Sequence, residues 1–153
     1  MPRGENQGES ETLPFMPSSA VRLALSRTLI ALLFSAMGVM HFVTPEPFMK
    51  VMPSMLPAPY ALVLVSGVFE ILGGIGVLIS RVRRAAGIGL IALLAAVYPV
   101  NITMFWRQVQ THPWDITSTV LLLRLPLQFV LIWWIVSACQ LTRKPRPSAS
   151  GMT

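Results

Sequence analysis

One stretch, residues 66–76, decides the fold class, and it has the sequence SGVFEILGGIG. It lies inside a long apolar run, Tyr60 to Ile79, and the nearest other charges along the chain are Lys50 and Arg81. A carboxylate, Glu70, therefore lies near the centre of a segment that is long and apolar enough to cross a membrane. Ionisable groups at that depth are costly and usually face a bundle interior or a wet cavity. We therefore ask which parts of the chain meet Glu70.

The composition indicates an integral membrane protein. Of the 153 residues, 54% are hydrophobic and only 12% are charged, whereas soluble domains have about 25% charged residues. The length predicts a single domain. The net charge of +6 comes from basic residues gathered at the ends of the apolar runs, a pattern typical of membrane topology and not of a nucleic-acid partner. The single cysteine, Cys139, excludes an intramolecular disulfide and Cys-x-x-Cys chemistry.

Four apolar runs of about 20 residues predict an all-α membrane protein, a four-transmembrane-helix antiparallel bundle with short connections. The membrane domain covers residues 22–142, with spans at 23–43, 60–79, 85–105 and 119–138. A signal peptide is the competing interpretation of the first run, but the run is long and has no clear cleavage site. Residues 1–21 have too few apolar side chains to fold, so we expect a disordered polar tail. Residues 143–153 form a basic C-terminal tail.

The two longer connections differ in character. The segment from Thr44 to Pro59 contains five prolines. Because proline lacks an N–H group and has a fixed φ, we expect a structured loop here, not a regular helix, lying on the bilayer surface or over the bundle mouth. Residues 106–118 are expected to form a polar loop, with Trp106 and Trp114 in the interfacial belt.

The distribution of lysine and arginine predicts the orientation. One group of three basic residues lies at the N-terminal side of the first span, a second connects the second and third spans, and a third follows the fourth span. The other two connections have one basic residue each. This bias places both termini in the cytoplasm. The three groups are Arg3, Arg22 and Arg27; Arg81, Arg83 and Arg84; and Arg143, Lys144 and Arg146, against Lys50 and Arg107.

Small residues recur where the spans are expected to pack. Close approach of helix backbones is the usual role of small residues in membranes. In the second span, Gly67, Glu70 and Gly74 share one face, with Gly73 beside them. The third span has a stripe of small residues that we expect to contact another helix: Ala85, Gly89, Ala92 and Ala96.

Five polar side chains lie within the outer halves of the spans, at depths of about 3 Å to about 15 Å: His41, Glu70, Asn101, Arg124 and Gln128. Arg124 and Gln128 are spaced i, i+4 and share a face. The long arginine side chain can reach toward Glu70, and an ion pair recovers much of the penalty of a charge in hydrocarbon. We therefore expect a Glu70–Arg124 ion pair, with Gln128, Asn101 and His41 around an outward-opening pocket.

More conservative interpretations of these residues remain open. The ion pair can serve only to set the helix register, and His41 can extend to the lipid headgroups. Asn101 can bond backbone carbonyls that Pro99 leaves without a donor. Two histidines and one cysteine do not make a zinc, haem or iron–sulfur site, so no metal is expected.

Taken in order, several short motifs make the chain resemble the DoxX family of small four-span membrane proteins. The resemblance extends from residue 38 to residue 128 and leaves out both tails. The motifs are GVMHF at 38–42 followed by Pro45 and Phe48, Pro53 and Leu56-Pro57, SGVFEILGG at 66–74, the arginine turn with Ala85-Ala86, Pro99-Val100-Asn101, and RLPLQ at 124–128.

The resemblance implies a multi-pass protein of the bacterial inner membrane. The family name refers to a subunit of a thiosulfate:quinone oxidoreductase, and some relatives are linked to redox or oxidative-stress systems. The family has no settled catalytic residues to carry over, although His41, Glu70, Asn101, Arg124 and Gln128 all fall within the matching motifs. The lack of paired cysteines argues against a thiol relay in this chain.

Three functions compete. The first is a subunit or accessory of a membrane redox system that contacts a quinone in the pocket, with a redox partner protein or a second copy of the chain. The second is a small-molecule or lipid-binding enzyme or transporter component, with Glu70 and His41 as acid and base. The third is a structural or assembly protein held by the Glu70–Arg124 pair.

Overall fold

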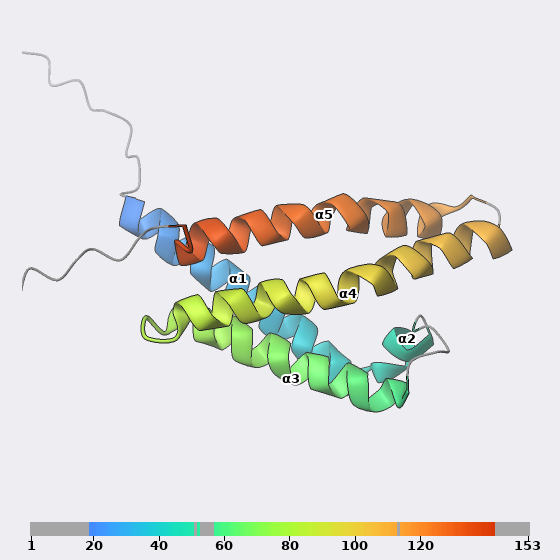
Figure 1. Cartoon of the computed structure of the whole chain (residues 1–153), viewed down its shortest axis with the longest axis horizontal. Helices are drawn as coiled ribbons and strands as arrows, with labels where there is room; N and C mark the ends of the chain where they lie inside the picture. The colour runs from blue at the N-terminus through green and yellow to red at the C-terminus, as the bar shows by residue number, and fades with distance from the viewer. Residues whose placement is uncertain (1–18, 51, 53–56, 113, 143–153) are drawn as a thin grey trace, which may run out of the picture.

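The computed structural model describes residues 19–50, 52, 57–112 and 114–142, and within these ranges it is helical, with no strand. The helices are α1 (Ser19–Val43), α2 (Pro45–Lys50), α3 (Pro59–Leu78), α4 (Arg83–Thr111) and α5 (Ile116–Cys139) (Figure 1). Residues 19–21, assigned to the tail by composition, belong to α1. The rest of the N-terminal tail and residues 143–153 lie outside the described residues, so those two predictions stay untested.

The four long helices confirm the predicted bundle of four apolar spans. α1, α3, α4 and α5 have 25, 20, 29 and 24 residues and are apolar enough to cross a membrane. At 1.5 Å per residue, even the shortest spans about 30 Å of hydrocarbon. Successive long helices run in opposite directions (Figure 1), and large apolar side chains cover their outer faces. The chain is therefore a multi-pass membrane protein; which side the termini occupy stays a prediction.

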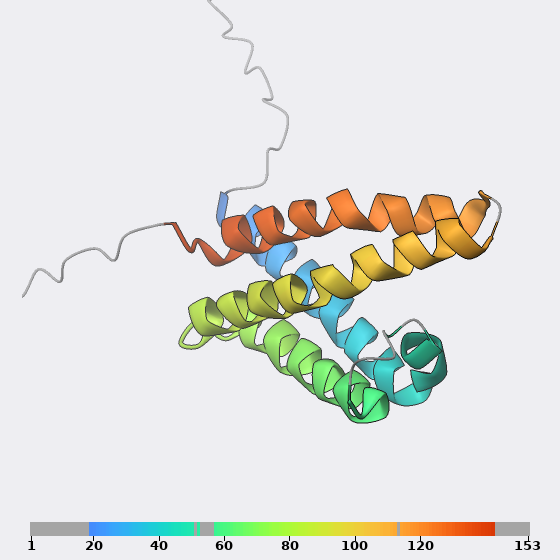
Figure 2. The same ribbon diagram turned by 45° about the vertical axis from the view of Figure 1, so that its right-hand side comes forward.

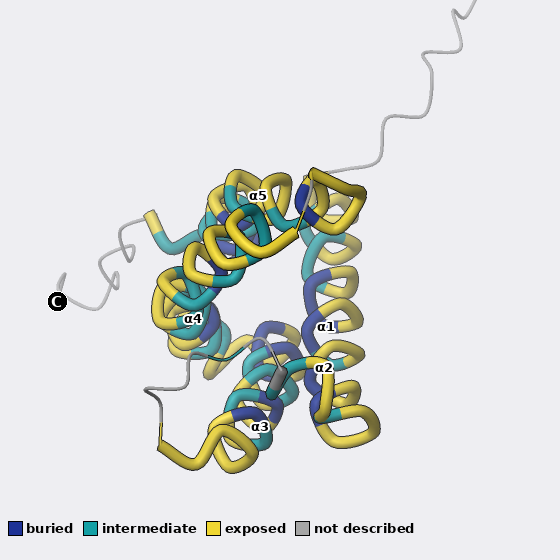
Figure 3. Tube along the Cα trace, turned by 90° about the vertical axis from the view of Figure 1, so that its right-hand side faces the viewer, coloured by how far each residue is buried: buried dark blue, intermediate teal, exposed yellow. Residues whose placement is uncertain are grey.

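The long helices pack as two pairs. α1 packs along α3, and α4 packs along α5, while α3 and α4 join the pairs. α1 approaches α5 closely only at one end of the bundle (Figures 1 and 2). We call this end, where α1 and α4 begin and α3 and α5 end, the arginine end. The opposite end, which carries α2, is the α2 end. Viewed from the α2 end, α1 and α5 stand apart (Figure 3).

The apolar core lies toward the arginine end. It contains side chains from all four long helices, and Trp134 of α5 packs against it. The Trp134 indole N–H also donates a hydrogen bond to Ser26 Oγ of α1, which ties the two helices together where they meet. The buried members of the core are Ile30, Phe34, Val77, Leu90, Ile135, Ala138 and Cys139.

Arginine side chains close the helix ends that meet here. Arg27 Nε donates to the carbonyl of Ala138 at 2.9 Å, and Arg84 Nη2 donates to the carbonyl of Leu141 at 3.1 Å. Arg83 Nε donates to the carbonyl of Val77 at 2.9 Å. The last carbonyls of a helix lack intrahelical donors and carry partial negative charge, so these guanidinium groups stabilise the C-terminal ends of α3 and α5.

Glycine allows α1 and α3 to cross closely. A Cβ on Gly38 would lie 2.6 Å from the carbonyl oxygen of Gly67, and a Cβ on Gly67 would lie 2.9 Å from that of Gly38. Neither backbone can yield as a side chain would, so the crossing requires both glycines. The expected packing of the second span through its glycines is confirmed at this crossing and at Gly74, whose Cβ would meet the carbonyl of Ala31 at 3.0 Å.

The small-residue stripe of the third span does not behave as expected. Ala85, Gly89, Ala92 and Ala96 are all exposed, and a Cβ on Gly89 would have no neighbour within 4 Å. α4 instead packs through Gly87, where a Cβ would lie 2.9 Å from Cys139 Sγ. The prediction of a helix contact along the stripe is wrong within this chain, because α4 turns the opposite face toward α3 and α5.

Two predicted loops are partly helical. Residues 45–50 form α2 despite Pro45 and Pro47, because the first turn of a helix does not use its N–H groups. α4 continues to Thr111 and α5 begins at Ile116, so the expected loop at 106–118 shortens to residues 112–115. The chain between Trp106 and Thr111 has no helix breaker, and helices usually end before a residue such as Pro113.

Candidate functional site

A cavity of about 610 Å³ lies between the α1–α3 pair and the α4–α5 pair. Its size falls within the usual range of small-molecule sites. Ten of its fourteen lining residues are apolar; the four polar ones are Glu70, Asn101, Arg124 and Gln128. Four of the five predicted site residues therefore line one cavity, with Glu70 from α3, Asn101 from α4, and Arg124 and Gln128 from α5.

The cavity wall is continuous with the outer surface of the bundle between α1 and α5. Leu33 and Met37 of α1 and Leu123 and Leu127 of α5 line the cavity, and all four are exposed, Leu123 by 61%. In a membrane this outer surface faces lipid. The separation of α1 from α5 toward the α2 end thus offers a lateral route from the bilayer to the polar groups.

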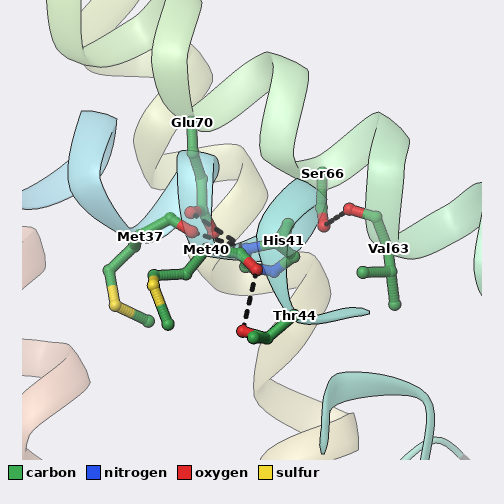
Figure 4. Close-up of polar contacts among 7 residues, drawn as sticks. All are labelled: Met37, Met40, His41, Thr44, Val63, Ser66 and Glu70. Carbon is green, nitrogen blue, oxygen red and sulfur yellow. Dashed lines mark hydrogen bonds and ion pairs between the residues drawn. The ribbon is translucent and has the colours of Figure 1, made fainter. Parts of the chain in front are cut away.

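Glu70 turns toward α1 (Figure 4). Its Oε2 lies 3.7 Å from Nδ1 of His41, and both side chains are largely buried, 15% and 10% exposed. His41 Nδ1 also lies 2.8 Å from the carbonyl oxygen of Met37. Because a carbonyl oxygen only accepts, Nδ1 carries a proton and donates it there. The 3.7 Å contact is too long for a hydrogen bond, and Glu70 Oε2 is the one buried side-chain polar atom of the described residues that lacks a hydrogen-bond partner.

The expected Glu70–Arg124 ion pair is wrong: within the described residues, the only basic group within ion-pair distance of an acidic side chain is His41, beside Glu70. The physical reason is helix adjacency. α5 packs against α4 and not against α3, so Arg124 faces Glu70 across the cavity without contact. His41 lies on α1, directly at the close crossing of Gly38 and Gly67, where a Cβ on Gly67 would lie 2.9 Å from the Cβ of His41. The crossing that brings the backbones together also brings His41 to Glu70.

Asn101 and Gln128 form an amide network between α4 and α5. Asn101 Nδ2 donates to Gln128 Oε1 at 3.0 Å, and Gln128 Nε2 donates to the backbone carbonyl of Leu94. Both amides are buried. Pro99 interrupts the hydrogen-bond ladder of α4 nearby and leaves the carbonyl of Ala95 without its helical donor. Asn101 donates to Gln128 and not, as one interpretation had it, to a backbone carbonyl. These amides hold the back wall of the cavity together.

His41 lies behind Glu70 and does not line the cavity. Its ring stacks on Phe48 of α2, with ring centroids 4.0 Å apart and an interplanar angle of 21°. His41 is 8% exposed, so the alternative that it extends to the lipid headgroups does not hold. α2 thus covers the α2 end of the α1–α3 pair; whether this segment also lies on the bilayer surface stays a prediction.

Three contributors to the site were missed from the sequence: the backbone carbonyls of Met37 and Leu94, and the ring of Phe48. A carbonyl has no sequence signal, because every residue carries one. The position of Phe48 did have a sequence signal. The first turn of a helix favours proline and an acidic residue, and the chain has Pro45, Glu46 and Pro47 just before Phe48. Such a helix would place Phe48 on one face.

The arrangement can hold an amphiphilic molecule. Apolar walls accept a hydrocarbon part, and Glu70 and Arg124 offer an acceptor and a cation on opposite sides of the polar end. Glu70 can exchange a proton with a ligand or with His41. Within the residues that the structure describes, no group of three or more His, Cys, Asp or Glu side chains comes together in a way that could hold a metal ion.

Comparison with known families gives one match. Residues 20–139 match the family described as Domain of unknown function (DUF8561). This range covers the four long helices except the first residue of α1, and it includes every residue of the cavity. Searches among curated proteins and among solved structures find no match.

Proposed function

The chain belongs to the DUF8561 family, and we propose that it binds an amphiphilic small molecule from the bilayer in the cavity between its helix pairs. The observation that carries this proposal is the composition of the cavity wall: about 610 Å³ lined by ten apolar residues and by Glu70, Asn101, Arg124 and Gln128. A space of this size, open toward the outer surface and lined mainly by apolar residues with a few polar groups, has the character of a small-molecule site.

The route between α1 and α5 supports the same function. A ligand dissolved in the membrane can reach the polar groups sideways, past Leu33 and Leu123, without entering water. The third competing function, an assembly protein held by a Glu70–Arg124 pair, loses its specific support because that pair is not formed in the described structure.

The biological setting of this binding is a proposal that rests on the resemblance to DoxX proteins. It would place the chain in a bacterial inner membrane as a subunit or accessory of a redox system, with a quinone as the bound molecule and a redox protein or a second copy as partner. A quinone suits the cavity because its carbonyl oxygens accept hydrogen bonds and its tail is apolar. A lipid-binding enzyme or transporter component would use the same cavity.

The proposal can be tested by filling the cavity. Val97→Trp places a large side chain in the lining, whereas Ile102→Trp places the same side chain on an outward-facing position of α4. Native mass spectrometry of the full chain in a mild detergent should show a co-purified amphiphile, or uptake of an added decyl-chain benzoquinone, in wild type and Ile102→Trp. Val97→Trp should lose it, and Glu70→Gln should weaken it.

Two results would count against the proposal. One is a folded wild type that carries no small molecule and takes up none. The other is equal loading of wild type and Val97→Trp, which would place any bound molecule on the outer surface. If Glu70→Gln loses ligand only to the extent that it loses folded protein, Glu70 has a structural role and does not bind the ligand directly.

A further inference from the structure

We propose that the molecule bound in the cavity is an amphiphilic acid, whose ionised oxyanion is held by Arg124. This inference rests on the proposed function of the cavity and names the class of its ligand. It follows from three features of the described residues: Arg124 has no hydrogen-bonded partner, the amides of Asn101 and Gln128 are bonded to each other and to the backbone, and apolar space lies beyond Arg124.

Arg124 lines the cavity without a partner. Its guanidinium forms no hydrogen bond and no ion pair with the described residues, although Glu70 faces the same cavity. An arginine within a membrane span normally pairs with an acidic group or with backbone carbonyls. The other arginines that enter the bundle do so: Arg27, Arg83 and Arg84 all donate to carbonyls. Arg124 is an exposed residue of α5; its five N–H donors meet no acceptor among the described residues, and Glu70 acts on it only through space.

The two amides of the cavity are already engaged, and Glu70 is directed away from Arg124 although its Oε2 forms no hydrogen bond. Gln128, one turn deeper than Arg124, bonds Asn101 and the Leu94 carbonyl. Glu70 turns its Oε2 into the α1–α3 contact beside His41. Glu70 and Arg124 are the ionisable side chains in the described lining, and the exposed Glu46 of α2 is not part of it. No described side chain is therefore positioned to neutralise Arg124 by contact.

The ligand chemistry follows from what a guanidinium binds. Its planar fork matches the two oxygens of a carboxylate or of a phosphate, and such charge-assisted pairs are stronger than neutral hydrogen bonds. Next to Arg124 the wall is made by Val120, Leu123 and Leu127, and toward the arginine end it continues with Leu131 and Phe34. This apolar stretch suits a hydrocarbon chain attached to the acidic group. A neutral quinone offers no charge to Arg124.

The test compares two probes that differ only in their polar end: hexadecanoate and hexadecanol. Binding to the full chain in nanodiscs of neutral lipid is measured for wild type, Arg124→Gln, Arg124→Lys and the control Arg107→Gln, whose arginine is exposed on α4 outside the cavity. We expect wild type and Arg107→Gln to bind the acid roughly tenfold or more tightly than the alcohol, as for one charged hydrogen-bonded contact. Arg124→Gln should lose this preference, mainly through weaker binding of the acid, and Arg124→Lys should restore part of it.

The same acidic chemistry can come from a fatty acid or from a lipid phosphate. Repeating the measurement in nanodiscs that contain phosphatidylglycerol separates the two sources. Displacement of hexadecanoate by this lipid in wild type, but not by phosphatidylcholine, supports the acid and identifies a lipid phosphate as its source. Hexadecanoate binding that this lipid leaves unchanged supports a free carboxylic acid.

The outcomes separate this inference from the proposed function. Equal binding of acid and alcohol by wild type, or an acid preference that survives in Arg124→Gln, overturns the inference and leaves an amphiphile cavity. Binding of neither probe by folded wild type overturns both. If Arg124→Gln does not fold, the preference for acid over alcohol is compared between wild type and Arg124→Lys. Lysine keeps the charge but not the planar fork, so a reduced preference in Arg124→Lys supports the inference and an unchanged preference overturns it.

Discussion

The two ends of the bundle differ in how they accommodate polar groups in an apolar setting. At the arginine end every described guanidinium that enters the bundle is matched with a helix carbonyl, and the apolar core fills the space between the helices. Toward the α2 end the helix pairs diverge, and polar side chains face a cavity in which Arg124 stays unmatched. Polar groups that serve stability are satisfied within the chain, and those left open are available to a ligand.

This contrast predicts that substitutions will separate cleanly into two kinds. Those at closely packed points should change the stability of the protein and leave the cavity's ligand preference intact. Those in the cavity should do the reverse. The following three predictions probe the contrast, in order of decreasing effect.

The largest effect is expected where the helix pair that carries His41 and Glu70 crosses. In Gly38→Ala the new Cβ would lie 2.6 Å from a backbone oxygen that cannot rotate away. We expect a loss of about 3 kcal/mol in the free energy of unfolding, the upper part of the range for overpacking, measured by denaturation in detergent. The matched control is Gly89→Ala on α4, where a Cβ meets nothing within 4 Å.

The control should gain stability, because alanine favours a helix over glycine by up to about 1 kcal/mol. The opposite signs of the two Gly→Ala changes are the critical result. Equal effects at both positions would mean that the crossing at Gly38 adjusts easily, and that the approach of His41 to Glu70 does not depend on it.

A smaller effect is expected at the arginine end. Arg27→Met removes the donor to the Ala138 carbonyl, and a hydrogen bond that involves a charged group contributes about 2 kcal/mol. We expect the thermal midpoint to fall while the cavity's preference between hexadecanoate and hexadecanol stays the same. Arg22→Met, at an exposed position of the same helix, serves as the control and should change neither. A shift in ligand preference with Arg27→Met would show that the two ends are coupled.

The smallest effect concerns the connection between α4 and α5. Asp115 caps α5: its Oδ1 accepts from the backbone N–H of Ser118 at 2.8 Å and from the Ser118 hydroxyl at 3.0 Å. The backbone bond, reinforced by side-chain bonds, lowers the pKa of Asp115 below its ordinary value. The carboxylate therefore stabilises the fold above the pKa of the unfolded chain, and this contribution is lost as the pH falls through the lower, folded-state pKa.

The measurement is the thermal midpoint of wild type and Asp115→Asn from neutral pH into the acid range, below about pH 4. Asparagine can also cap a helix but does not titrate there. We expect the difference between the two proteins to shrink or change sign as the pH falls. Parallel pH profiles would show that the carboxylate of Asp115 makes no charge-dependent contribution.

Much of the fold could be predicted because hydropathy and helix rise act locally. The four spans follow from apolar runs of sufficient length, and the placement of Glu70, Asn101, Arg124 and Gln128 in the same half of the bundle follows from 1.5 Å per residue. Depth along the membrane, however, does not say which helices are neighbours. The expected Glu70–Arg124 pair failed for that reason: both residues lie at suitable depths, but α4 separates α5 from α3.

Helix ends and helix faces were harder to predict. Hydropathy falls at Trp106 while the helix continues to Thr111, because a helix can extend past the apolar zone until a breaker is reached. The stripe at Ala85, Gly89, Ala92 and Ala96 has the composition of a packing face, yet α4 buries Gly87 and Leu90 instead. Small residues permit a close contact but do not determine which helix fills it.

The position of Cys139 makes its thiol a built-in probe of opening at the arginine end. It is the chain's only cysteine, it is 3% exposed, and it lies against Gly87, where α4 and α5 meet. A membrane-permeant thiol reagent can reach it only when the arginine end opens, so its labelling rate reports the free energy of that local opening. The labelling rate of Cys139 can therefore be compared with and without a ligand in the cavity. The comparison uses the native chain and needs no engineered label.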